Sequence, residues 1–150
     1  MEKVFNVDLD IKRSTSTFAG AVQFDNKTSI LSITLKDNNK PFGVPVGYDV
    51  QLVFRRPDKK IFIIDGETTV DENGQTLKFT LDSLVLSVFG IADVEVRVTK
   101  GEEILTTGRF ALEIRESLLS SGKEVSYFAK VSAIPIDKIE SILMGVQDGK

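Results

Sequence analysis

Strict alternation of apolar and polar residues between positions 91 and 115 constrains the fold of this chain more than any other feature. The apolar positions of the two runs are Val94, Val96 and Val98, then Phe110, Leu112 and Ile114. Successive side chains of a β-strand point to opposite faces, so each run has one face for a core and one for water. Lys100-Gly101 is typical of a turn, because glycine accepts the positive φ of a tight hairpin. We therefore expect two antiparallel strands, with residues 103–107 in the return path.

Similar runs recur along the preceding chain. Strands are predicted at residues 3–11, 18–24, 28–36, 48–56, 61–64 and 75–81. Turns rich in Asn, Asp, Pro and Gly separate several of them, and Asn73-Gly74 is the strongest hairpin signal. Regularly spaced short strands without βαβ alternation are typical of an all-β protein. The pattern predicts an antiparallel β-sandwich of seven to eight strands.

Three local features add detail to this prediction. Gly20 lies inside the apolar run 18–24, which is either a short strand with a bulge or a connection that lies on the sheet. Residues 61–64 are apolar at every position, as in a strand that is covered on both sides or lies at an edge under another element. Asp82 can cap one turn of helix before the strands of the 91–115 region begin.

Composition excludes several classes of function. The 150 residues contain no cysteine and no histidine, so disulfides, thiolate metal sites and histidine-based catalytic triads cannot form. The net charge of −3 provides no basic footprint for nucleic acid. No apolar run has the length of a membrane helix, and the first residues lack the apolar segment of a secretory signal. We therefore expect no enzyme, no cofactor or metal, and no membrane partner.

Two pairs of acids are the remaining catalytic candidates. Asp8 and Asp10 occupy alternate positions of one predicted strand, and Asp93 and Glu95 do so in another. Such pairs could serve a glycosidase or bind a cation. Since apolar residues take the intervening positions, we interpret both pairs as the solvated faces of half-buried strands.

Two acidic loops and one basic cluster can each be interpreted in two ways. The acidic segments 37–39 and 71–74 are oxygen-rich, but neither has the ligand spacing of a calcium loop, and turn formation explains them better. The basic cluster Arg55, Arg56, Lys59 and Lys60 could meet phosphate or an acidic partner. We favour the other reading, that it protects a hairpin edge against aggregation.

The pattern changes after Glu116. Residues 118–123 resemble an exit from the sandwich, and residues 137–147 have the periodicity of a short amphipathic helix with a capping box formed by Asp137 and Glu140. Its apolar stripe either packs on the sandwich or pairs with copies of itself. The candidate packing or oligomer face comprises Ile136, Ile139, Ile142, Leu143 and Val146.

The order of motifs between Thr28 and Ser117 resembles a known family. TSILSITLKDNNKPF is a strand and turn, and YDVQLVFRRPDKK is a strand that enters a Pro-Asp turn. DSLVLSVFGIADVEVRV and ILTTGRFALEIRESL follow. This succession resembles the N-terminal domain of the phage baseplate upper protein family, found in the tails of siphophages and prophages of Gram-positive bacteria.

The resemblance implies a structural role in the virion. Family members carry an immunoglobulin-like sandwich that docks on central baseplate proteins, followed by a helical linker that trimerises. Here residues 1–117 would be the docking domain and residues 118–150 the linker, with other tail proteins as partners and synthesis in the bacterial cytoplasm. The length leaves no room for a receptor-binding head, so the chain is either a short member or the N-terminal part of a longer protein.

A carbohydrate-binding sandwich that takes part in host-surface adhesion is the alternative. Sugar sites offer exposed aromatic rings, but tryptophan is absent and Tyr48 and Tyr127 are the two tyrosines. Tyr48 also falls on the apolar side of its predicted strand. We therefore expect docking through protein surfaces rather than sugar binding.

Overall fold

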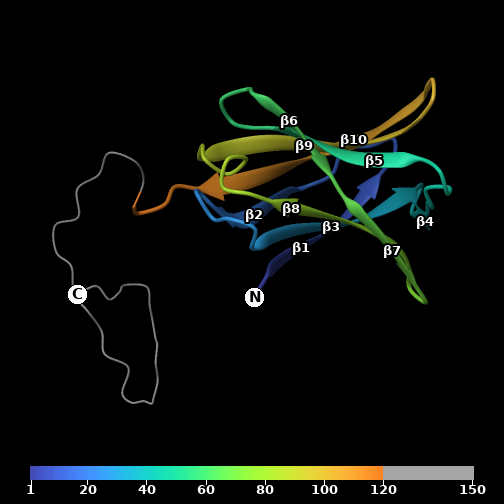
Figure 1. Ribbon diagram of the computed structural model, residues 1–150, viewed down its shortest axis with the longest axis horizontal. Helices are drawn as coiled ribbons and strands as arrows, with labels where there is room; N and C mark the ends of the chain where they lie inside the picture. The colour runs from blue at the N-terminus through green and yellow to red at the C-terminus, as the bar shows by residue number, and fades with distance from the viewer. Residues whose placement is uncertain (120–150) are drawn as a thin grey trace, which may run out of the picture. The chain divides into compact units, whose positions relative to one another are not determined.

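The structure is a computed structural model that describes residues 1–119. The chain divides into two units, Met1–Ser117 and Leu118–Lys150. The described residues contain ten strands and no helix (Figure 1). The strands are β1 (Lys3–Asp10), β2 (Thr17–Val22), β3 (Ser29–Asp37), β4 (Lys40–Pro41), β5 (Asp49–Arg55), β6 (Ile61–Asp65), β7 (Glu67–Asp71), β8 (Gly74–Leu81), β9 (Gly90–Lys100) and β10 (Glu103–Arg115).

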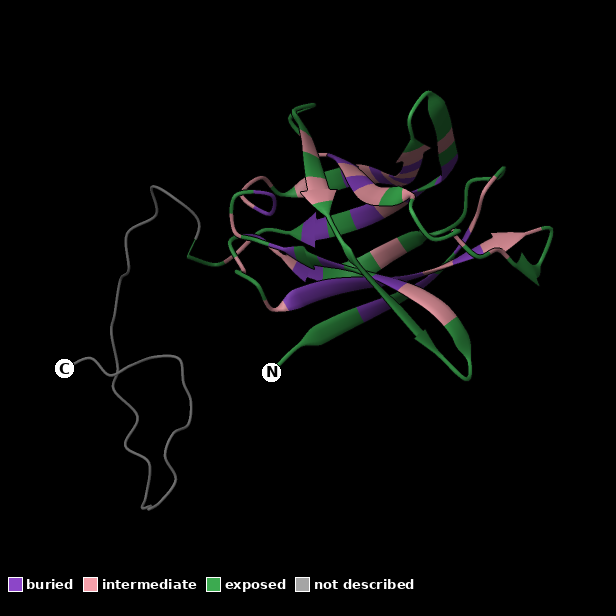
Figure 2. Cartoon of the chain, turned by 45° about the vertical axis from the view of Figure 1, so that its right-hand side comes forward, coloured by how far each residue is buried: buried purple, intermediate pink, exposed green. Residues whose placement is uncertain are grey.

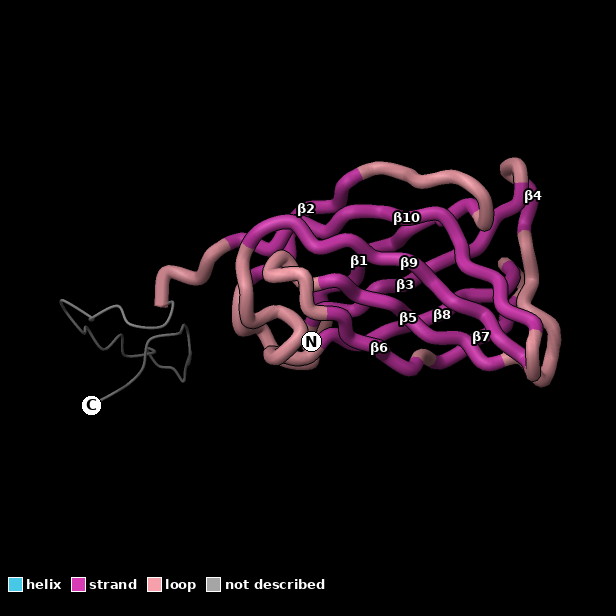
Figure 3. The backbone as a smooth tube through the Cα atoms, turned by 90° about the horizontal axis from the view of Figure 1, so that it is seen from above, coloured by secondary structure: helices cyan, strands magenta, loops and turns pink. Residues whose placement is uncertain are grey.

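The strands form two sheets that face each other. The first sheet, sheet A, has the order β1-β3-β8-β7, with the short β4 beside β3. The second, sheet B, has the order β2-β10-β9-β5-β6. Seen from above, β2 and β6 lie along opposite margins of the layered domain (Figure 3). Each sheet therefore has two edges, formed by β1 and β7 in sheet A and by β2 and β6 in sheet B.

One apolar core lies between the sheets (Figure 2). The inward positions of both sheets are buried, as the alternating pattern predicts, and the largest fully buried side chains include Phe54, Phe79 and Phe110. Val94 and Val96 are fully buried, whereas their outward neighbours keep intermediate exposure. Burying this apolar surface is the main favourable contribution to the stability of such a domain.

Two strand pairs are parallel, which corrects the expectation of a purely antiparallel sandwich. β1 runs parallel to β3, and β2 runs parallel to β10. Periodicity reveals which side chains share a face, but it carries no information about the direction of a neighbouring strand. The remaining pairs are antiparallel, including the predicted hairpin of β9 and β10.

The strand count is also higher than the predicted seven to eight. β4 has only two residues and pairs with β3 across an Asn38-Asn39 turn. The chain also continues without a loop from β6 in one sheet to β7 in the other, as Figure 1 shows. Gly66 is the residue between them. A Cβ atom there would lie 2.3 Å from the Phe79 ring, so only glycine fits against the core at this crossing.

A second glycine lies where the β1–β2 connection crosses β10. The register of β9 and β10 shifts between Thr106 and Arg109, which marks a bulge around Gly108. A Cβ atom on Gly108 would lie 1.8 Å from the carbonyl oxygen of Arg13. Just beyond, the Thr15 N–H donates to the Arg109 carbonyl over 2.9 Å. The bare backbone of Gly108 therefore lets the chain pass from sheet A to sheet B.

The local predictions for Gly20 and Asp82 have different outcomes. Gly20 has a φ of 122°, and the β2–β10 register shifts there, so the predicted bulge is present. The Asp82 carboxylate accepts a hydrogen bond from the Val85 N–H at 3.0 Å, which is a capping contact. However, residues 82–88 form turns and not a helix. The predicted helix at 137–147 and its apolar face lie outside the described residues.

Arg56 joins two loops at one end of the domain. Its side chain is only 6% exposed and makes a bidentate pair with Asp58, at 2.8 and 2.6 Å. The same guanidinium donates to the Leu84 carbonyl and the Ser87 hydroxyl, and it lies 4.9 Å from the centre of the Phe62 ring. Pairing with Arg56 lowers the pKa of Asp58 to about 2, which keeps this carboxylate ionised.

Replacing Gly108 with alanine should destabilise the domain. The added methyl group overlaps the Arg13 backbone, which cannot move as a flexible side chain could, so we expect a loss of about 2–3 kcal/mol in the free energy of unfolding. Urea unfolding followed by circular dichroism measures this. Gly43→Ala is the matched control, because nothing lies within 4 Å of a Cβ atom there. Equal stability of the two variants would contradict the crossing described above.

Replacing Arg56 with alanine should also be costly. The change removes charged hydrogen bonds to three partners, for which we expect a loss of about 2–3 kcal/mol. Arg55→Ala serves as the control: Arg55 is more exposed and forms one surface ion pair, which is worth at most about 1 kcal/mol. If the Arg55 variant proves less stable than the Arg56 variant, Arg56 does not join the two loops as described.

Candidate interaction surface

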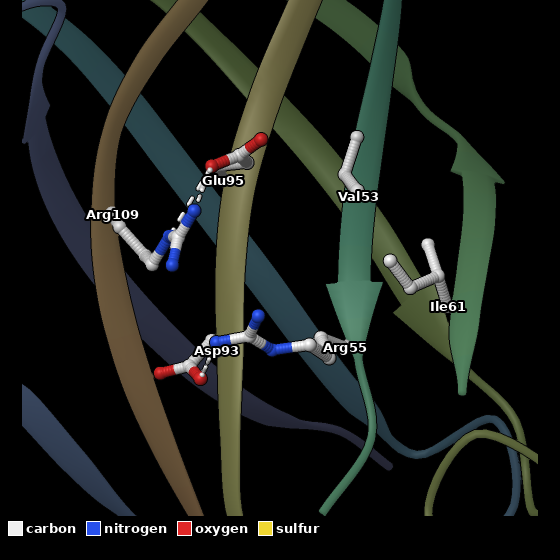
Figure 4. A pocket seen from close by; sticks show the side chains of 6 residues that line it. All are labelled: Val53, Arg55, Ile61, Asp93, Glu95 and Arg109. Carbon is white, nitrogen blue, oxygen red and sulfur yellow. Dashed lines mark hydrogen bonds and ion pairs between the residues drawn. The ribbon is translucent and has the colours of Figure 1, made fainter. Parts of the chain in front are cut away.

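The acids of β9 are paired with arginines on the outer face of sheet B. Asp93 bonds to Arg55 of β5, and the Glu95 carboxylate accepts from Nε and Nη2 of Arg109 in β10, at 3.3 and 3.2 Å (Figure 4). Both pairs follow from register, since Arg55 lies opposite Asp93 and Arg109 lies opposite Glu95. The carboxylates are therefore neutralised by cross-strand partners, which supports the reading of these acids as part of a solvated face.

The hollow between these two ion pairs is shallow. Its volume is about 60 Å³, and the apolar residues Val53 and Ile61 complete its lining (Figure 4). Substrate pockets are typically several times larger, roughly 300–1,000 Å³. The hollow has the size of a recess for one side chain of a partner rather than a substrate site.

The acids of β1 have a different environment. Asp10 accepts hydrogen bonds from the backbone N–H groups of Lys12, Arg13 and Asn38, at 2.7, 3.1 and 3.1 Å. These bonds, with the one from Lys12 the largest contribution, lower the pKa of the Asp10 carboxyl. Asp8 lines the same polar hollow but belongs to an exposed position of the strand. Asp10 therefore holds the β1–β2 loop in shape.

The acidic loops form turns, as expected. Asn38 and Asn39 have φ values of 55° and 69°, which asparagine tolerates better than most residues. In the other loop, the Asn73 N–H donates to the Asp71 carboxylate at 2.8 Å. Among residues 1–119, no three acidic residues gather closely enough to hold a metal ion.

The basic cluster divides into residues with different roles. Arg55 belongs to the outer face of sheet B, whereas Arg56 is buried against the loop 82–88. Lys59 and Lys60 are exposed at the β5–β6 turn, beside the edge strand β6. Arg56 has the phase of the buried residues Leu52 and Phe54, but the sequence did not show which groups would pair with its charge on the inward side.

Exposed isoleucines surround the ion pairs of sheet B. Ile61 and Ile63 on β6 are 60% and 51% exposed, Ile91 on β9 is 51% exposed, and Ile104 on β10 is 58% exposed. Strand register places them on the same face as the ion pairs. We define the Ile–Arg face as Ile61, Ile63, Ile91, Ile104, Arg55 and Arg109. Sequence analysis missed this surface, although Ile91 shares the phase of the polar residues of its strand.

The outer face of sheet A is more polar. Its β8 strand exposes Lys78 and Thr80, and β7 exposes threonine and acidic side chains. Val4 and Val70 are the large apolar residues exposed on the strands of this sheet. Arginine and apolar side chains are enriched at the centre of protein interfaces, whereas lysine and acids are depleted. The Ile–Arg face is therefore the better candidate for an interaction surface.

The hollow beside Tyr48 bears on the carbohydrate alternative. It has a volume of about 380 Å³ and is lined mainly by apolar residues. The Tyr48 hydroxyl donates to Glu103 at 2.5 Å, and this bond raises the pKa of the tyrosine. The amine of Lys100 lies 5.4 Å from the centre of the tyrosine ring. One ring face is thus occupied by a cation, which leaves less room for a stacked sugar. Tyr127 lies outside the described residues.

Comparison with known proteins assigns the family. Within the described part of the chain no helix is long and apolar enough to cross a membrane. No curated protein matches the sequence. The BppU N-terminal domain family matches residues 3–140, which is most of the chain and includes the whole two-sheet domain. The chain therefore belongs to the BppU N-terminal domain family, the N-terminal domain of the phage baseplate upper protein, and is a structural protein of the phage tail baseplate.

Proposed function

We propose that this protein is a docking and scaffold module of the tail baseplate that acts through protein–protein interfaces. The family match over residues 3–140 is the observation that carries this proposal. The contacts of three of the four acids considered for catalysis agree with it, since Asp93 and Glu95 form ion pairs and Asp10 holds a loop. In this proposal the two sheets form an immunoglobulin-like sandwich, supported by their shared core.

The Ile–Arg face is the surface that we assign to docking. Its arginines are held by carboxylates, so little side-chain freedom is lost when a partner covers them. Its isoleucines supply apolar area that water covers in the free protein. Several copies around a tail axis would add many such contacts, so that individually weak interfaces become strong together.

We assign an oligomerising role to the segment that follows the domain. The spacing of Ile136, Ile139, Leu143 and Val146 is that of a short bundle helix, and a trimer is the state that we favour. The two-sheet domain would then be presented in several copies, each able to contact the tail.

Reversing the charge of both arginines of the Ile–Arg face should weaken tail docking. Arg55→Glu with Arg109→Glu places four acids together on one face, so we expect roughly a tenfold or larger loss of affinity for the partner tail protein. Binding of the purified chain to tail proteins of the same phage, measured by calorimetry, tests this. Lys78→Glu on the outer face of sheet A is the control and should bind normally.

Three results would oppose this proposal. If the double variant binds as tightly as the unmodified chain, docking uses a surface other than the Ile–Arg face. If Lys78→Glu lowers the affinity equally, the loss is a general effect of charge. Failure of the unmodified chain to bind any tail protein, with clear binding on a glycan array, would favour the carbohydrate alternative.

The oligomeric state of the chain should depend on the apolar stripe of its last segment. Ile139→Asp with Leu143→Asp puts charges at the predicted helix contact, so we expect the mass in light scattering to fall from that of a trimer to that of a monomer. Ser141→Asp, outside the stripe, should leave the mass unchanged. A monomeric unmodified chain would contradict the role assigned to this segment.

A further inference from the structure

The β6 strand is an apolar strand at a free edge of sheet B. It pairs with β5 on one side, and the sheet ends there among the described residues (Figure 3). Ile61 and Ile63 on its outer face are more than half exposed. Phe62 and Ile64 face the core but keep intermediate exposure, because no described element covers the edge. The run of apolar residues noted in the sequence therefore lies at an edge without the covering element that we expected.

Hydrogen-bond geometry shows which backbone groups are free at this edge. The Arg56 N–H donates to the Lys60 carbonyl and the Arg56 carbonyl accepts from the Lys59 N–H, both at 2.8 Å, so both backbone groups of Arg56 point toward the returning chain. Along two antiparallel strands, hydrogen-bonded residue pairs alternate with pairs that are not hydrogen-bonded, so Phe62 and Ile64 also bond to β5. The N–H and C=O groups of Ile61, Ile63 and Asp65 then point away from the sheet, where another strand can pair with them.

The other three edges carry features that discourage pairing. β1 bears several charged side chains, and β7 exposes all five of its residues, among them Glu67 and Asp71. β2 is interrupted by the bulge at Gly20. Charges and bulges are common means of protecting an edge. β6 lacks both between Ile61 and Ile64, so it differs from the other edges in being apolar and regularly paired along its length.

The charges that flank β6 indicate what pairs with it. Lys59 and Lys60 precede the strand, whereas Asp65 and Glu67 lie at and beyond its end. An identical strand in antiparallel orientation brings the basic end of each copy beside the acidic end of the other. We propose that β6 pairs with β6 of a second copy of this chain across a two-fold axis at Ile63, which joins two copies of sheet B into one continuous sheet.

The register of this pairing follows from the free backbone groups. With Ile63 on the axis, the two Ile63 residues exchange N–H···O=C bonds, and Ile61 pairs with Asp65 of the second copy. Phe62 and Ile64 of opposite copies become neighbours on the core side, and Lys59, in the turn before β6, lies at the same end of the contact as Glu67 of the other copy. Each copy contributes the same surface, as a two-fold contact requires. The pairing goes beyond tail docking and does not depend on it.

A contact of five residues per copy is small. It buries less than the roughly 1,000 Å² of a stable interface, so the pair forms and separates rapidly unless other contacts hold the copies together. Covalent capture is therefore the appropriate measurement. The chain contains no cysteine, which allows single cysteines to be placed without background.

Disulfide trapping of the full chain tests the proposal. Residues of a hydrogen-bonded antiparallel pair have Cα atoms about 5.5 Å apart, a separation that a disulfide spans. Under mild oxidation Ile63→Cys should form linked pairs roughly tenfold faster than Val70→Cys, because pairing raises the local thiol concentration. Val70 is a suitable control position, because it is 71% exposed and lies on another edge strand, β7. Equal rates for the two variants would overturn the proposal.

A charge swap tests the register and the choice of partner. In the Ile63→Cys background, Lys59→Glu places two acids opposite each other and should slow trapping several-fold, whereas adding Glu67→Lys restores the attraction and the rate. The antiparallel pairing of identical strands would be overturned if Lys59→Glu left the trapping rate unchanged. It would also be overturned if adding Glu67→Lys did not restore the rate. Circular dichroism of each variant confirms that the two-sheet domain is folded.

Discussion

The contact between the inward faces of the two sheets is the interaction on which the rest of this structure depends. Neither sheet can remove its apolar face from water alone, so Phe79 of one and Phe54 and Phe110 of the other are buried only because the sheets face each other. All other features, including the loops at the ends and the charged outer faces, are supported by this core.

The chain passes between the sheets at several points, and two of these crossings depend on a glycine. At Gly66 the backbone lies against the Phe79 ring, and at Gly108 it lies against the Arg13 carbonyl. Each of these two crossings joins an edge strand of one sheet to an edge strand of the other, β6 to β7 and β1 to β2. The position of β6 at an edge therefore follows from the way in which the chain changes sheets, and its capacity to pair with another strand follows from that position.

Much of the fold was predictable from the sequence, and less of the interaction surface was. Alternation located most strands, and the acidic loops proved to be turns. The parallel direction of β1 and β2 was not predictable, because it depends on contacts with strands far along the chain. The paired state of Asp93 and Glu95 was likewise hidden, since register alone brings Arg55 and Arg109 beside them.

By itself the sequence determined where strands and turns occur and which side chains of each strand share a face, because these properties depend on residues that are near one another in the chain. Only the tertiary structure decided which strands are neighbours, which groups pair with the guanidinium of Arg56, and that four exposed isoleucines gather around two ion pairs. The physical reason is that packing of the whole core selects the neighbours of each strand, and no single segment contains that information.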